Sequence, residues 1–107
     1  MRTERIAEVG MDDEGKVFVR PVSGSFEYIY RAGMEIYWNE STKRLSHPAQ
    51  RDWSPARWVR QIVAAMASEY HVLLELTDET VWSNVSHDLC AEIIAEVNRK
   101  PAEHTPK

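Results

Sequence analysis

The sequence predicts an α+β domain in which an antiparallel β-meander of three to five strands precedes a helix, a strand and a second helix. Short alternating segments fill the first half of the chain, an amphipathic helix follows at Ser54–Tyr70, and a second helical stripe begins after Ser86. Strands grouped before helices favour helices packed on one sheet face. The 107 residues suit one domain, which we assign to residues 1–100, with a mobile tail at 101–107.

The first two strands form a predicted hairpin. Ile6–Met11 and Lys16–Pro21 flank a turn rich in Asp and closed by Gly15, which can adopt positive φ. Within the second strand Val17 and Val19 share one face, whereas Phe18 points to the other. Because a proline cannot donate to a β-ladder, we expect the strand to end or lie at an edge at Pro21.

Two more alternating segments extend the meander. In Phe26–Arg31 the aromatic residues at 26, 28 and 30 share a face, and we expect that face to lie under the first helix. In Met34–Asn39 the apolar residues at 34, 36 and 38 share a face. A further short strand fits around Leu45.

The helix Ser54–Tyr70 carries the clearest local signals in the chain. Ser54 suits the N-cap and Pro55 the first helical position, where a missing N–H costs nothing. Apolar residues then recur at spacings of three and four, and this stripe requires a sheet to cover. The stripe comprises Trp58, Val59, Ile62, Val63, Met66 and Tyr70.

The remaining elements complete the order helix, strand, helix. Val72–Leu76 reads as a strand whose pairing, parallel or antiparallel, the sequence leaves open, and Val81-Trp82 reads as a strand extension or a loop anchor. Ser86 suits a second N-cap, and Pro101 ends the helix that follows. The apolar stripe of that helix comprises Leu89, Cys90, Ile93, Ile94 and Val97.

Composition excludes several classes of protein. The net charge is −4, which disfavours nucleic acid as a partner, and Cys90 stands alone, which favours a reducing compartment. The N-terminal segment lacks the apolar core of a signal peptide, and no stretch has the 18 or more apolar residues that a membrane span needs. We therefore expect a cytoplasmic protein that does not enter a membrane.

Three segments resemble a known group of proteins. Ser23–Arg31 (SGSFEYIYR), Asp52–Ile62 (DWSPARWVRQI) and Trp82–Ser86 (WSNVS) are similar to small uncharacterised proteins carried by bacterial integron gene cassettes. The resemblance covers about residues 6–97. It implies a compact α+β domain without an assigned activity, and it assigns a role to no residue.

Aromatic residues are the first candidates for a binding site. Trp and Tyr combine an apolar body with a polar tip, so they serve cores and ligand pockets alike. In one interpretation these aromatic side chains pack under the first helix. In the other they line an aromatic cleft that binds a ligand. Tyr37 and Trp38 occupy opposite faces of one strand, which favours a homodimer through the sheet. The candidates are Tyr28, Tyr30, Tyr37, Trp38, Trp53 and Trp58.

Basic residues give a second candidate site. Between Thr42 and Arg60 five Lys and Arg residues face a single Asp, a local charge of +4 that leaves −8 for the rest of the chain. Arg57 and Arg60 are three apart and can share a helix face near the positive helix end, which suits an anion. The alternative is a solvated face with local salt bridges.

Catalytic signals are weak. The four histidines lack metal-ligand spacing, and His87 with Cys90 gives two ligands where zinc usually takes four, so we expect no metal and no cofactor. Glu75 lies within the apolar run VLLEL; buried, it could act as an acid or base, and on an alternating strand it faces solvent. His71 suits the end of the first helix.

We therefore expect a non-catalytic module that binds a protein or small molecule through an aromatic cleft or a sheet face. One alternative is a small enzyme with an acid or base in a Tyr- and Trp-lined pocket. Another is an anion or nucleic-acid binder at Arg57 and Arg60. The identity of the ligand cannot be inferred from the sequence.

Overall fold

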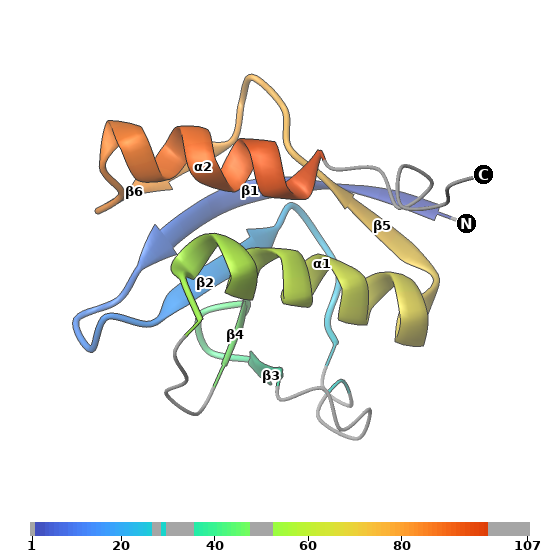
Figure 1. Cartoon of the computed structure of the whole chain (residues 1–107). Coiled ribbons are helices and arrows are strands. Elements are labelled where there is room, and N and C mark those ends of the chain that lie inside the picture. The colour runs from blue at the N-terminus through green and yellow to red at the C-terminus, as the bar shows by residue number, and fades with distance from the viewer. Residues whose placement is uncertain (1, 27–28, 30–35, 48–52, 99–107) are drawn as a thin grey trace.

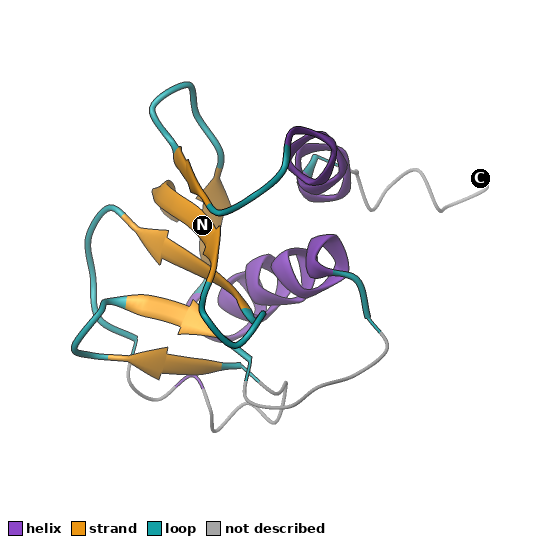
Figure 2. Cartoon of the chain, turned by 90° about the vertical axis from the view of Figure 1, so that its left-hand side faces the viewer, coloured by secondary structure: helices purple, strands orange, loops and turns teal. Residues whose placement is uncertain are grey.

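The computed structural model describes residues 2–26, 29, 36–47 and 53–98. It contains a six-stranded mixed sheet and two helices, which confirms the predicted α+β class. Both helices lie on the same side of the sheet (Figures 1 and 2). In chain order the elements are β1 (Arg2–Met11), β2 (Val17–Pro21), β3 (Tyr37–Asn39), β4 (Arg44–Ser46), α1 (Pro55–Tyr70), β5 (Val72–Glu75), β6 (Val81–Ser83) and α2 (His87–Val97).

Strand β1 lies in the interior of the sheet, whose order is β3-β4-β2-β1-β5, with β6 also paired to β1. The pairs β1–β2, β2–β4 and β4–β3 are antiparallel, as predicted for the first half of the chain. Their order differs from the predicted meander, because β2 pairs with β4 and the intervening strand β3 lies beyond β4 at the edge. Strands β5 and β6 both pair in parallel with β1, one along Arg2–Arg5 and the other along Glu8–Gly10. The sequence left the pairing of β5 open, and the structure makes it parallel.

A bulge in β1 sets which residues face the helices. The register with β2 shifts between Ile6 and Glu8, so Ala7 is an extra residue. Ile6 and Val9, three residues apart, are consequently both buried, whereas regular alternation would place them on opposite faces. On the other side of β1 the Thr80 hydroxyl donates to the Ile6 carbonyl at 2.8 Å, where the chain passes from β5 to β6.

Helix α1 covers the sheet as its stripe predicts. Ser54 is the N-cap, and its Oγ accepts a hydrogen bond from the Arg57 N–H at 3.2 Å. His71 closes the helix in the left-handed conformation, with its N–H bonded to the Met66 carbonyl. The buried face of α1 packs into one core with strand residues and with Ile93 of α2. The fully buried members include Val9, Val19, Leu45, Val59, Ile62, Met66 and Leu74.

The predicted strand at Phe26–Arg31 differs from the structure at its two described residues. Alternation would place Phe26 and Ile29 on opposite faces, but both are buried in the core. The Ile29 N–H donates to the Phe26 carbonyl at 3.2 Å, which is a turn rather than a ladder contact. The Phe26 ring meets Trp38 and Tyr70 edge-on, at centroid distances of 5.3 and 5.1 Å. This packing of three rings accounts for the difference.

Several predicted features lie outside the described residues. These are Tyr28 and Tyr30, the first two residues of the strand predicted at Met34–Asn39, and the tail at 101–107. The described part of that strand runs over Tyr37–Asn39, and Ile36 before it is buried.

Candidate functional site

One face of the sheet carries both helices, and no described element covers the other (Figure 2). We call this second surface the outer face. A row of paired residues crosses it. Phe18 lies opposite Ser46 on one side and Gly10 on the other, and Tyr37 and Ser83 continue the row at its two ends. The outer face therefore combines an aromatic ring, hydroxyl groups and a glycine on rigid strands.

A stack of three groups stands at the centre of the outer face. A Cβ at Gly10 would meet the Phe18 ring at 2.7 Å, so the absence of a side chain allows the ring to lie against the backbone of β1. On the ring rests the Arg44 guanidinium, its carbon 3.7 Å from the ring centroid. A cation over an aromatic face is attracted by the quadrupole of the ring. Gly10 and Phe18 together therefore hold Arg44 in place.

Beside this stack Glu8 lies in a hydrogen-bonded network. Its carboxylate accepts from the Ser83 hydroxyl and from Arg20 Nε, the latter at 3.1 Å, and its side chain is 15% exposed. The hydrogen bond from Ser83 lowers the pKa of Glu8 below its usual value; burial opposes this, and Arg20 and the more distant Arg44 add to it. Glu8 is thus paired with Arg20. Arg44 forms no ion pair within 4.0 Å with any residue in the described ranges.

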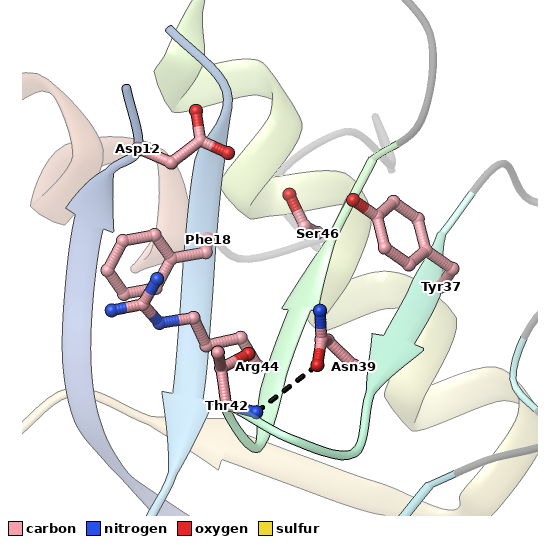
Figure 3. A pocket seen from close by; sticks show the side chains of 7 residues that line it. All are labelled: Asp12, Phe18, Tyr37, Asn39, Thr42, Arg44 and Ser46. Atoms are coloured by element: carbon pink, nitrogen blue, oxygen red, sulfur yellow. Dashed lines mark hydrogen bonds between the residues drawn. The ribbon is translucent and has the colours of Figure 1, made fainter. Parts of the chain in front are cut away.

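A pocket of about 80 Å³ opens next to the stack (Figure 3). Its lining comes from the β1–β2 hairpin, from β3, from β4 and from the β3–β4 turn. The residues are Asp12, Phe18, Tyr37, Asn39, Thr42, Arg44 and Ser46.

The internal hydrogen bonds of the pocket decide which atoms remain for a ligand. Asn39 Oδ1 accepts the N–H groups of Ser41 and Thr42, at 2.9 and 3.2 Å, so its Nδ2 donors remain and point into the pocket (Figure 3). Ser46 donates its proton to the Val17 carbonyl at 2.8 Å, which leaves its Oγ as an acceptor. The pocket thus offers the donors of Arg44 and Asn39 in fixed positions.

The sequence prediction included Tyr37 but missed the other pocket residues as a site. Arg44 was counted only in the basic segment, and Asp12 only in a turn. The usable signal was Phe18, a large aromatic residue on the opposite face from Val17 and Val19. Its partner Gly10 becomes visible only once the register of the hairpin is known.

The predicted aromatic candidates separate into different environments. Tyr37 is half-buried and lines the pocket, whereas Trp38 packs on the core side, with its indole N–H donating to Glu40 at 2.7 Å. Trp58 is 2% exposed and belongs to the core, stacked on His47 with ring centroids 4.0 Å apart. Trp53 packs against Trp58 at 4.6 Å.

The two arginines of the predicted anion site have separate contacts. The Arg57 guanidinium lies 4.3 Å from the centroid of the Trp53 ring, whereas Arg60 pairs with Glu96 of α2 at 3.8 Å. Arg60 therefore links the two helices.

The acid–base candidates do not gather at a pocket. Glu75, His71 and His87 are exposed and line none of the described pockets. Within the described part of the chain, no three His, Cys, Asp or Glu residues are grouped so as to hold a metal ion. Neither helix, of those described, has the length and apolar character to cross a membrane.

Comparison with known proteins identifies relatives whose printed names state no activity. A family model described as "Integron Cassette Protein Hfx_Cass5" matches residues 4–80. A solved structure of Hfx_Cass5, from the mobile metagenome of the North West Arm sewage outfall, is 43% identical and covers 92% of this chain and 99% of its own. Its TM-score is 0.46, so the assignment rests on sequence. No curated protein matches.

These matches confirm the resemblance to integron cassette proteins that the sequence suggested. The family model covers the chain from Glu4 in β1 through β5, with the whole pocket. The chain belongs to the Hfx_Cass5 family of integron cassette proteins.

Proposed function

We propose that this protein is a non-catalytic binding module whose ligand site is the pocket on the outer face. The ligand is a small molecule with an anionic group, which the Arg44 guanidinium binds. The single observation that carries the proposal is the position of Arg44, which is held on Phe18 beside the pocket and pairs with no carboxylate in the described structure.

The chemistry of the neighbours supports an anion. One face of the guanidinium lies on Phe18, so its N–H edge remains for a carboxylate or phosphate in a fork geometry. The Asn39 amide donors point into the same pocket, and the Tyr37 side chain lines it. Because these groups stand on strands, a ligand would not have to order them first, which lowers the cost of binding.

The absence of a catalytic arrangement at the pocket supports a binding role. The nucleophile and base of a hydrolase must lie within hydrogen-bond reach of each other, with the base oriented by a third group. The serine of the pocket, Ser46, donates its proton to a backbone carbonyl, and the carboxylate of the pocket, Asp12, accepts two backbone N–H groups of the hairpin. Glu8, outside the pocket, is hydrogen-bonded to Ser83 and Arg20. These contacts suit groups that hold a site together.

The test is an NMR titration of ¹⁵N-labelled protein with acetate, butanoate and inorganic phosphate. We expect one of these anions to shift the amides of residues 37–46 and 8–20. Arg44→Gln should weaken that binding at least about tenfold, since a hydrogen bond to a charged group contributes about 1.5–3 kcal/mol.

The matched control is Arg57→Gln. Arg57 is also an arginine stacked on an aromatic ring, but it belongs to α1 and lines none of the described pockets. Its removal should leave the dissociation constant within about twofold. Equal losses in both variants would contradict the proposal, and so would outer-face amides that no anion shifts.

A further inference from the structure

We propose that the ligand is a zwitterion, a carboxylate that also carries an ammonium group several bonds away, as in an ω-amino acid. This inference rests on the proposed function, because it assigns the carboxylate to Arg44. Its new content is the second charge, which we assign to Asp12. Asp12 lies at the opposite end of the pocket from Arg44 and Thr42 (Figure 3).

The Arg44 end of the pocket has an excess of positive charge. Two guanidinium groups, those of Arg20 and Arg44, act on one carboxylate, that of Glu8. Arg20 donates to Glu8 directly at 3.1 Å, whereas Arg44 acts on it only from a distance. One positive charge therefore remains at this end, together with the donors of Asn39.

The Asp12 end of the pocket has an excess of negative charge. The carboxylates of Asp12 and Glu14 accompany one ammonium group, that of Lys16. Lys16 pairs with Glu14 at 3.3 Å, and this contact, more than its weaker attraction to Tyr37 and Asp12, raises the pKa of Lys16. Asp12 therefore forms no ion pair with a described residue, and it is the carboxylate of this turn that lines the pocket.

Asp12 also keeps an oxygen for a ligand. Its Oδ1 accepts the backbone N–H groups of Glu14 and Lys16, both at 2.9 Å, which fixes the side chain at the mouth of the hairpin. The second oxygen has no hydrogen bond to a described residue. A carboxylate oxygen held in this way suits an ammonium donor.

The spacing of the strands sets the length of the ligand. The Arg44 guanidinium lies on the Phe18 ring, Phe18 pairs with Gly10, and Asp12 is two residues further along the chain. Two residues of a strand span about 7 Å. A flexible chain of a few carbons between its carboxylate and its ammonium group lets a ligand reach both sides, and 4-aminobutanoate is such a molecule.

The experiment compares 4-aminobutanoate with butanoate by NMR titration of the intact protein. The two probes differ only in the ammonium group. We expect 4-aminobutanoate to bind about fivefold or more tightly, as one additional charge-assisted hydrogen bond predicts. Arg44→Gln should weaken the binding of both probes.

Asp12→Asn is the decisive variant because Asn keeps the Oδ1 acceptor of the hairpin and loses only the charge. It should abolish the preference for 4-aminobutanoate while leaving butanoate binding within about twofold. Glu14→Gln, which removes a negative charge already paired with Lys16, should retain the preference. Thermal melting of each variant checks that the fold persists.

The zwitterion proposal would be refuted if butanoate bound as tightly as 4-aminobutanoate, or if the preference survived Asp12→Asn. Either result would leave the proposed anion site unaffected. If neither probe binds, and acetate and phosphate do not bind either, the proposed function itself would be refuted.

Discussion

The two faces of this sheet come from the same strands but depend on different interactions. Toward the helices, Val9, Val19 and Leu45 are fully buried in an apolar core. On the outer face, the neighbouring residues Glu8, Phe18 and Arg44 form a hydrogen-bonded and stacked network. Hydrophobic burial is non-directional, whereas such a network requires specific geometry. Stability should therefore depend mainly on the first face and ligand recognition on the second.

The largest effect is expected on the helix-facing side. Ile62→Ala removes a fully buried side chain of α1 and leaves a cavity, so the free energy of unfolding should fall by about 2–5 kcal/mol. Urea denaturation measures this change. The control Ser68→Ala, at an exposed position of the same helix, should change stability by less than about 0.5 kcal/mol. A small loss at Ile62 would contradict the assignment of the core to this face.

Gly10→Ala should reduce both stability and binding. The new Cβ would lie 2.7 Å from the Phe18 ring and 2.7 Å from the backbone oxygen of Ser83. Relieving such overpacking costs about 1–3 kcal/mol and displaces the ring on which Arg44 rests. Denaturation and anion titration measure the two effects.

A double-mutant cycle sharpens this prediction. Phe18→Leu shortens the side chain, so the combination with Gly10→Ala should cost less than the sum of the single losses, by about 1 kcal/mol. Additive losses would show that the Phe18 ring does not depend on Gly10.

Glu8 should make the outer face sensitive to acid. Its pKa is lowered from 4.5 in the folded protein, chiefly by the hydrogen bond from Ser83, so the carboxylate stabilises the fold above pH 4.5. That contribution is lost as the pH falls through the lower, folded-state pKa. Glu8→Gln should cost about 1–2 kcal/mol at pH 7 and much less at pH 3. A cost that stays the same at both values would contradict a charged role.

The smallest effect concerns an exposed network at the β3–β4 turn. The hydrogen bond from Lys43, with those from Trp38 and Ser25, lowers the pKa of Glu40 to about 2. Lys43→Ala should move the NMR titration midpoint of Glu40 upward, toward 4.5, without a measurable change in melting temperature. An unchanged midpoint would show that Lys43 does not hold the carboxylate.

The sequence predicted the elements whose signals are local. Ser54, Pro55 and the apolar stripe were enough to place α1 at Pro55–Tyr70, and Ser86 was enough to begin α2 at His87. The hairpin of β1 and β2 followed from alternation and Gly15. Each of these inferences uses residues within a few positions of one another.

The parts that could not be predicted depend on distant residues. The interior position of β1 requires β5 and β6, which lie some 70 residues later. The bulge at Ala7 changes which residues face the core, and the residue pattern of β1 alone does not predict this bulge. The pocket combines Asp12, Phe18 and Arg44 from three segments, so the site exists only after the strands have paired.

The pairing of β1 also constrains how the chain reaches its native state. One side of strand β1 pairs with β5 and β6. Residues Arg2–Arg5 and Glu8–Gly10 therefore cannot form these pairs until the later strands have been synthesised. Contacts between distant residues slow folding, because the entropy of closing a long loop must be lost first. A circular permutation that placed β5, β6 and α2 before β1 would let the partners of β1 be synthesised first.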